Sequence, residues 1–253
     1  MKPFKFKHLF FDLDRTLWDY ETNCREVLDD LYDQHLSSLN LFDSESFRHA
    51  FHIENKKLWD AFTKNKIDKA HLRKYRFINT LNTFSLDNSA LSETLEEQYL
   101  EQTPSKTKLL PHADTIIKEL SENYTLHILT NGFEDVQNFK LKNIGLHEYF
   151  NTVITSDLAG ARKPQPEIFS YAMNLAGAEI HQSVMIGDDP HVDILGAEMF
   201  GLPYIMYNST NIPHQLTNPT EVTSLIEIPE LLRKMEQERS SETNEDQSSV
   251  LSR

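Results

Sequence analysis

Five short apolar segments limit what this chain can fold into more than any other feature of its sequence. Each is apolar almost throughout and lacks the strict alternation of a half-exposed strand. Runs of this kind are typical of strands that are buried on both faces at the centre of a parallel sheet. The predicted strands are Lys7–Asp12, Thr125–Thr130, Thr152–Thr155, Ser183–Gly187 and Pro203–Tyr207.

Amphipathic helical patterns follow most of these strands. They cover Ala113–Leu120, Glu134–Ile144, Pro166–Ala176 and Asp193–Phe200. A chain that alternates strand and helix in this way forms a parallel sheet with helices on both faces. The sequence therefore predicts an α/β fold with a doubly wound, Rossmann-like core.

The stretch between the first two predicted strands has a different character. Residues 21–105 show helical periodicity and no convincing strand, which predicts an all-helical cap domain inserted into the core. We expect the core to comprise residues 1–20 and 106–236. Residues 237–253 are polar, charged and rich in serine, and a segment with so little to bury is predicted to be disordered.

The composition excludes several classes of partner and location. A net charge of −14 argues against nucleic acids and anionic membranes, because both repel an acidic surface. The single cysteine, Cys24, rules out an intramolecular disulfide and a thiolate metal cluster. No apolar run approaches the length of a membrane span or a signal peptide. We therefore expect a cytoplasmic protein, a monomer or homodimer. The acidic charge does not exclude a small phosphorylated metabolite as substrate, since a few cations in a cleft can outweigh the overall field.

Residues with chemically active side chains or backbone amides follow the predicted strands, at the edge of a parallel sheet where ligands bind. They are Asp12, Asp14, Thr130, Asn131, Gly132, Lys163, Asp188 and Asp193. If the strands are adjacent, these groups converge on one pocket. So many carboxylates would repel one another without a cation, and oxygen ligands of this kind suit Mg²⁺ better than Zn²⁺.

Phosphoryl transfer is the chemistry that fits this set. The Asp12 carboxylate can attack phosphorus and form an aspartyl-phosphate. Asp14 can protonate the departing oxygen and then deprotonate the hydrolytic water.

The other groups suit the binding of phosphate. Thr130 and the amides of Asn131 and Gly132 can hold phosphoryl oxygens, and Lys163 and Mg²⁺ can neutralise their charge. Each motif alone is weak evidence, because paired aspartates and Gly-Asp turns are common. Four motifs in this order, each after a predicted strand, are specific.

At this point the sequence resembles the haloacid dehalogenase superfamily, from about Lys5 to Tyr207. The four signatures of that superfamily are matched by FFDLDRTLWD (Phe10–Asp19), ILTNG (Ile128–Gly132), ARKPQPEIF (Ala161–Phe169) and IGDDPHVDILGA (Ile186–Ala197). The resemblance implies a Rossmann-like core with a helical cap and hydrolysis of phosphate monoesters.

The resemblance also implies roles for individual residues. Asp12 would be nucleophile and Mg²⁺ ligand, the Asp14 backbone carbonyl a second ligand and Asp188 a third. Asp193 would orient metal-bound water, and Thr130 and Lys163 would bind phosphate.

Two residues of the first signature separate this chain from other branches of the superfamily. True dehalogenases lack the second aspartate, so the presence of Asp14 argues against dehalogenation. Arg15 stands where a glycine or small polar residue is often found, and the sequence does not indicate its role.

The segments TLWDY (Thr16–Tyr20) and LRKYRF (Leu72–Phe77) resemble the branch of pyrimidine and noncanonical nucleoside 5′-monophosphate phosphatases. By that resemblance Trp18, Tyr20 and Arg76 are candidates for contacting a base or sugar. The alternative is that Trp18 and Tyr20 pack the hinge of the cap and that Arg76 lies on a solvated helix face.

A Mg²⁺-dependent nucleoside 5′-monophosphate phosphatase is therefore the favoured function. The alternatives within the superfamily are a phosphoglycolate or sugar-phosphate phosphatase and a phosphomutase or phosphotransferase. A catalytically silent module that binds a phospho-ligand is disfavoured, because binding alone needs neither Asp12 nor Asp14 in the proposed roles. Water access, which cap geometry controls, separates a phosphatase from a mutase.

Overall fold

Two compact units make up the chain in the computed structural model, which describes residues 4–217 and 219–251, with side chains up to residue 241. The core unit comprises Met1–Asp19 and Leu109–Arg253, and the helical unit comprises Tyr20–Lys108. Among the described residues, no helix combines the length and apolar character needed to cross a membrane.

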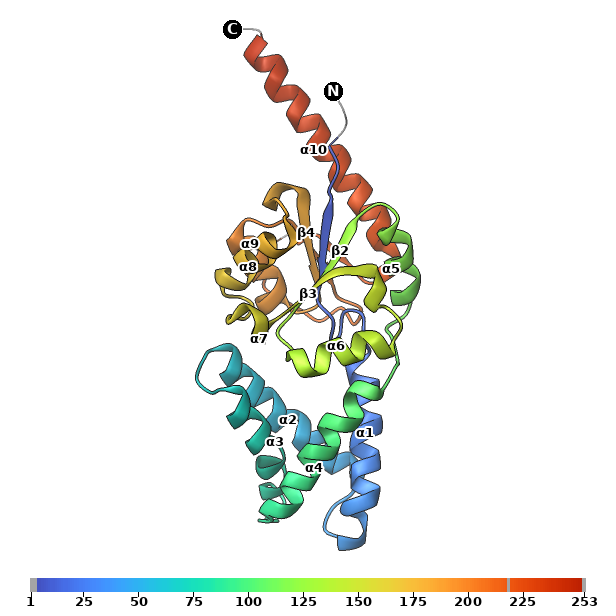
Figure 1. Ribbon diagram of the computed structural model, residues 1–253, viewed down its shortest axis with the longest axis vertical. Coiled ribbons are helices and arrows are strands. Elements are labelled where there is room, and N and C mark those ends of the chain that lie inside the picture. The colour runs from blue at the N-terminus through green and yellow to red at the C-terminus, as the bar shows by residue number, and fades with distance from the viewer. Residues whose placement is uncertain (1–3, 218, 252–253) are drawn as a thin grey trace. The chain divides into compact units, whose positions relative to one another are not determined.

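A parallel sheet forms the centre of the core unit (Figure 1). The strand order is β3-β2-β1-β4-β5-β6, and every neighbouring pair is parallel. The strands are β1 (His8–Phe11), β2 (Thr125–Thr130), β3 (Phe150–Thr155), β4 (Ser183–Gly187), β5 (Tyr204–Tyr207) and β6 (Glu221–Val222). The predicted doubly wound α/β core is confirmed. The sequence did not predict β6, because two residues carry no periodic signal.

Helices cover both faces of this sheet, with α8 and α9 on one face and α5 and α10 on the other (Figure 1). The helices of the core unit are α5 (Ala113–Ser121), α6 (Glu134–Asn143), α7 (Ser156–Ala159), α8 (Pro166–Ala176), α9 (Leu195–Phe200) and α10 (Ile228–Leu251). The helix predicted over Asp193–Phe200 is α-helical only from Leu195, because Pro190–Ile194 form a π-helical turn.

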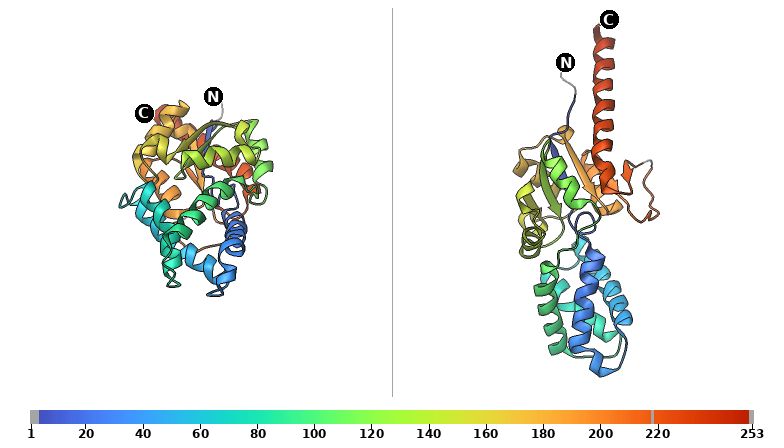
Figure 2. Two further views of the ribbon diagram at one scale, coloured as in Figure 1. Left: turned by 60° about the horizontal axis from the view of Figure 1, so that its bottom comes forward. Right: turned by 90° about the vertical axis from the view of Figure 1, so that its right-hand side faces the viewer.

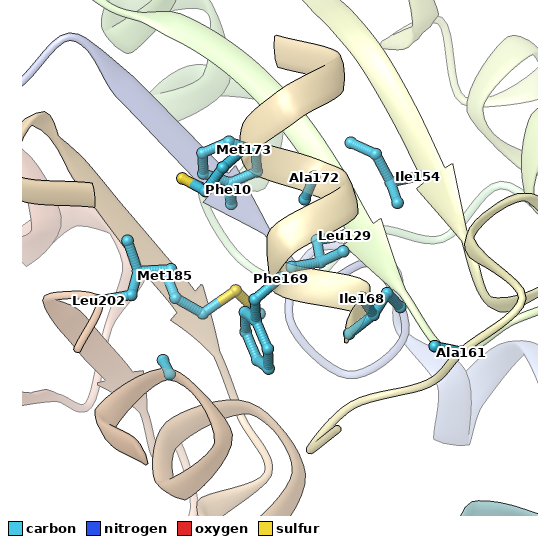
Figure 3. Close-up of a cluster of buried hydrophobic side chains, with 11 residues drawn as sticks. Phe10, Leu129, Ile154, Ala161, Ile168, Phe169, Ala172, Met173, Met185 and Leu202 are labelled. Atoms are coloured by element: carbon cyan, nitrogen blue, oxygen red, sulfur yellow. The ribbon is translucent and has the colours of Figure 1, made fainter. Parts of the chain in front are cut away.

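Helix α8 packs on the sheet through a stripe of side chains that its sequence spaces three and four positions apart (Figure 3). Ile168, Phe169 and Ala172 are fully buried. They lie in one cluster with Phe10 of β1 and Leu129 of β2. Truncation of a buried aromatic such as Phe169 lowers the free energy of unfolding by about 3–5 kcal/mol, so the packing of α8 contributes substantially to the stability of the sheet.

Four long helices form the helical unit, and neighbouring helices pack together as a bundle (Figure 2). They are α1 (Tyr20–His35), α2 (Ser44–Thr63), α3 (Lys69–Asn82) and α4 (Ser89–Gln102). Three of them begin at a side-chain cap: Asp43, Asp68 and Asn88 each accept a hydrogen bond from the backbone amide three residues later, at 2.7, 2.7 and 3.0 Å. Such caps stabilise a helix by about 1 kcal/mol each.

Helix α10 extends into the segment for which the composition predicts disorder. The described part of that segment, residues 237–251, is helical, and residues 252–253 lie outside the described residues. Polar contacts hold the helix beside the N-terminal segment: the Phe6 amide donates to Glu236 at 3.0 Å and the Phe4 amide to Ser240 at 2.9 Å. An argument from apolar content does not detect contacts of this kind.

Candidate functional site

Asp12 lies where the strand order of the sheet reverses. The chain leaves β1 toward β2 and β3 on one side, and β4 and β5 lie on the other. The Asp12 amide donates to the Ile186 carbonyl of β4 at 2.9 Å, so the backbone stays paired for one residue beyond β1. The crevice beyond such a reversal is where open α/β sheets bind ligands.

Three carboxylates predicted as metal-site residues lie together at this point. Asp12, Asp188 and Asp193 each offer an oxygen, and these oxygens lie within 4.8 Å of one another. Thr16 donates to Asp188 at 3.0 Å. A Cβ on Gly187 would lie only 2.4 Å from Asp193 Oδ2, so this glycine makes room for the Asp193 carboxylate.

Burial and crowding disfavour the charged form of all three carboxylates. Burial, with the Asp193 charge, raises the pKa of Asp12 to about 7, even though Lys163 opposes the shift. Burial, with the charges of Asp193 and Asp12, raises the pKa of Asp188 well above its ordinary value. Burial also raises the pKa of Asp193. The cluster therefore has a deficit of positive charge.

Lys163 is the buried cation of the cluster, with 1% of its surface exposed. Its Nζ lies 2.7 Å from Asp12 Oδ1, 2.6 Å from Asp193 Oδ1 and 2.6 Å from the Leu129 carbonyl. Burial alone would lower the pKa of Lys163, but Asp12 and Asp193 raise it, so the ammonium stays charged. Asn131 fixes the Lys163 backbone by accepting from its amide at 2.7 Å and donating to its carbonyl at 2.9 Å.

Thr130 ends β2 with its hydroxyl group in a fixed orientation. Thr130 Oγ1 accepts hydrogen bonds from the Gly132 amide and from Gln137 Nε2, both at 3.0 Å. A hydroxyl has two acceptor sites and one proton to donate. With both acceptor sites filled, the proton remains available for an anionic ligand.

Asp14 is held by two residues of α6 that the sequence analysis missed. Gln137 Nε2 donates to Asp14 Oδ2 at 2.7 Å, and Lys140 forms an ion pair with Asp14 Oδ1. Burial would raise the pKa of Asp14, but Lys140 and Gln137 hold it below its ordinary value. The only available sequence signal was two polar residues three positions apart on the helix after the Thr130–Gly132 motif.

Trp18 does not present a free face for a base or sugar. It is fully buried, and Lys140 Nζ lies 3.8 Å above the centre of its ring. The structure therefore favours the packing role over the substrate-contact role for this residue.

Tyr20 and Arg76 belong to the helical unit. The Tyr20 hydroxyl accepts from Asn55 at 3.1 Å. Arg76 is 4% exposed, donates to Glu96 at 2.9 and 2.5 Å and lies over the Tyr99 ring. The alternative of a solvated helix face is wrong for Arg76, because the side chain is buried and paired with Glu96. Contact of Arg76 with a base or sugar stays a prediction.

Arg15 adopts a left-handed backbone conformation, with a φ of 67°. Glycine reaches this region without a steric penalty, which explains why a glycine suits this position. The Arg15 charge lowers the pKa of Asp14 further, after the larger effects of Lys140 and Gln137, and it opposes part of the rise that burial causes in the pKa of Asp188. The side chain thus supplies a second positive charge beside the acidic cluster.

The donor set fits a small divalent cation. Asp12, Asp188 and Asp193 offer hard oxygen ligands close together, and Mg²⁺ is bound in proteins by one or two carboxylates together with water and substrate oxygens. Burial first, and then the like charge of neighbouring aspartates, raises the pKa of each carboxylate, and a cation among them would favour their charged forms.

Comparison with known proteins gives one family and several relatives. The model of the haloacid dehalogenase-like hydrolase family matches residues 6–201. The pyrimidine 5′-nucleotidase YjjG of Escherichia coli is 30% identical, over 91% of this chain and 99% of that enzyme. The pyrimidine 5′-nucleotidase PynA of Streptococcus pneumoniae is 29% identical, over 88% of this chain and 91% of that enzyme.

A solved structure shares the fold over nearly the same extent. It is the HAD hydrolase YfnB of Bacillus subtilis bound to magnesium, with a TM-score of 0.81 and 25% identity. The match covers 90% of this chain and 99% of that one. The similarity therefore extends over both units of the chain.

Proposed function

This chain belongs to the haloacid dehalogenase-like hydrolases and is a phosphatase of that family, and we propose that it hydrolyses nucleoside 5′-monophosphates through a covalent aspartyl-phosphate on Asp12. The observation that carries the proposal is the position of Asp12, a buried carboxylate at the strand-order reversal with Lys163 2.7 Å away. A lysine at this distance can attract a phosphoryl group to the carboxylate that attacks it.

The first half of the reaction transfers the phosphoryl group to Asp12. A carboxylate oxygen of Asp12 forms a bond to phosphorus while the bond from phosphorus to the ester oxygen breaks. Asp14 supplies the proton that the departing alkoxide needs. The Thr130 hydroxyl donates to a phosphoryl oxygen, and Lys163 balances the negative charge.

The second half releases phosphate. Asp14, ionised once it has protonated the departing oxygen, takes a proton from water as the water attacks phosphorus, and the bond between phosphorus and Asp12 breaks. Asp12, Asp188 and the Asp14 backbone carbonyl would hold Mg²⁺, with Asp193 beside it. The ion would supply charge neutralisation for the phosphoryl oxygens.

The choice of nucleotides as substrates is supported by the relatives. Two relatives that match about nine-tenths of this chain are named as pyrimidine 5′-nucleotidases. The magnesium in the related YfnB structure supports the proposed cofactor.

Phosphate release from a panel of phosphomonoesters tests the proposal. The panel contains pyrimidine and purine nucleoside monophosphates, phosphoglycolate and hexose phosphates, each assayed with Mg²⁺ and with a chelator. We expect metal-dependent release that is fastest with pyrimidine monophosphates. Faster release from phosphoglycolate or a hexose phosphate would overturn the nucleotide assignment, and undiminished release in chelator would overturn the role of Mg²⁺.

A further inference from the structure

Gln137 connects two groups of the site that come from different strands. Its Nε2 donates to Asp14 Oδ2 at 2.7 Å and to Thr130 Oγ1 at 3.0 Å. A side-chain amide nitrogen carries two hydrogens, so one is available for each acceptor. The opposite amide orientation would place a carbonyl oxygen against the Asp14 carboxylate, which can only accept.

The surroundings of Gln137 show that its amide is placed for this contact. Gln137 is 1% exposed, and its Oε1 has no hydrogen-bond partner among the described residues. An unsatisfied buried acceptor costs about 1–3 kcal/mol. The orientation thus satisfies Asp14 and Thr130 at the expense of the carbonyl end of Gln137 itself.

Gly132 provides the space that this bridge needs. A Cβ at position 132 would lie 1.9 Å from Gln137 Nε2 and 2.5 Å from its Cδ. Gly132 does not adopt a positive φ, so the backbone conformation does not require glycine there. The absence of a side chain lets the Gln137 amide pass between Thr130 and Asp14.

We propose that Gln137 is a positioning residue that fixes the Asp14 carboxylate relative to the phosphate-binding hydroxyl of Thr130. The proposal rests on the function proposed above, in which Asp14 transfers the proton and Thr130 binds the phosphoryl group. Lys140 holds the other oxygen of Asp14. Without Gln137, Lys140 alone determines where the carboxylate points, and its distance from the departing oxygen is no longer fixed.

The consequence depends on the leaving group. An alkoxide leaves only as it receives a proton, so a displaced Asp14 slows cleavage of an alkyl phosphate. p-Nitrophenolate leaves without a proton, so cleavage of p-nitrophenyl phosphate is less affected. A change in phosphate binding through Thr130 would instead affect both substrates equally.

The test compares kcat/KM for p-nitrophenyl phosphate and for the best alkyl phosphate of the panel in Gln137→Met, which keeps the side-chain length and removes the donor. Because kcat/KM covers the steps up to phosphorylation of Asp12, its ratio between the two substrates reports on the leaving group. The ratio does not depend on the fraction of folded enzyme. We expect alkyl phosphate cleavage to lose about 10-fold more than p-nitrophenyl phosphate cleavage.

Two further variants make the result decisive. Asp14→Asn is the reference and should shift the ratio in the same direction by about 100-fold. Adding Gln137→Met to Asp14→Asn should shift the ratio no further, because both act through the same carboxylate. Asn138→Met, at the next position of α6, where the side chain bonds back to the Glu134 carbonyl, should leave the ratio unchanged.

The outcomes separate the inference from the proposed function. An unchanged ratio in Gln137→Met, together with a shifted ratio in Asp14→Asn, would overturn the positioning role alone. An unchanged ratio in Asp14→Asn would overturn the acid role of Asp14 and the inference with it. An additive effect in the double variant would show that Gln137 does not act through Asp14.

Discussion

Asp12 is the single residue on which the proposed chemistry depends most directly. Replacement by asparagine removes the proposed nucleophile while keeping the shape of the side chain, and Lys163 retains its ion pair with Asp193. We expect Asp12→Asn to lower kcat by about 1,000-fold or more without loss of thermal stability. The measurement is phosphate release, with mass spectrometry to exclude deamidation back to aspartate. Full activity in verified Asp12→Asn would contradict the mechanism.

A substitution at Gly132 tests the role of Gln137 without changing Gln137 itself. In Gly132→Ala the added Cβ meets the far end of a flexible side chain, so the Gln137 amide must move while the backbone stays in place. We expect a small stability cost, about 1 kcal/mol, and the same leaving-group bias as in Gln137→Met. Kinetics on the two substrates check this, and wild-type selectivity in Gly132→Ala would contradict it.

At this scale the sequence singled out carboxylates that the structure brings together, and packing of the strands does not need such residues. The carboxylates after β1 and β4 stood out because they interrupt apolar strands. Gln137 and Lys140 did not stand out, since polar residues on a helix are ordinary and their partner Asp14 lies more than a hundred positions away. Only the folded arrangement identifies such a pair.

At the scale of elements, a chain of side-chain hydrogen bonds joins three neighbouring strands of the sheet. His8 of β1 and His127 of β2 are joined by a 3.1 Å hydrogen bond, and His127 bonds Thr152 of β3 at 2.7 Å. His127 also stacks on Phe10. Burial, with the neighbouring His8, lowers the pKa of His127 to about 4.

The lowered pKa of His127 predicts that stability changes with pH. His127 binds a proton near pH 6.5 in the unfolded chain but only near pH 4 in the folded protein. Protonation of the unfolded chain therefore lowers the free energy of unfolding as the pH falls from about 6.5 to about 4. We expect wild type to lose up to about 3 kcal/mol more than His127→Gln across this window. Denaturant unfolding of both proteins at several pH values isolates the effect, and parallel profiles would contradict it.

The buried pair in the helical unit gives a second prediction for an element. Arg76→Met leaves Glu96 buried and uncompensated, which should lower the free energy of unfolding by about 3–5 kcal/mol. Arg76→Met combined with Glu96→Leu should recover most of this loss. Denaturant unfolding measures both. A rise in KM without a loss of stability would instead show that Arg76 binds substrate.

Strands were easier to predict than helix partners. The apolar runs placed all of the strands except β6, because a strand buried on both faces leaves a continuous signal. The contacts of Arg76 and of α10 could not be predicted, since polar groups form them and a polar residue in a helix reads as exposed.

At the scale of the whole molecule, the proposed metal site at the acidic cluster predicts that Mg²⁺ changes stability. Asp188→Asn removes one of the three crowded carboxylate charges. In the presence of a chelator, this variant should therefore be at least as stable as wild type. In Mg²⁺ at about 100 times its Kd, wild type should gain about 2.7 kcal/mol and Asp188→Asn much less. Thermal unfolding with and without Mg²⁺ checks both statements, and equal gains would remove Asp188 from the metal site.

The central place of β1 also has a consequence for the order in which the protein can fold during synthesis. His8 of β1 and His127 of β2, whose side chains are hydrogen-bonded, are 119 positions apart, and Phe6 and Glu236 are 230 positions apart. At about 5–20 residues per second, a ribosome needs about 10–50 s to cover the longer separation. The helical unit is one continuous stretch and is complete first. The strand that leads into Asp12, the proposed nucleophile, therefore emerges early and acquires its full set of neighbours late.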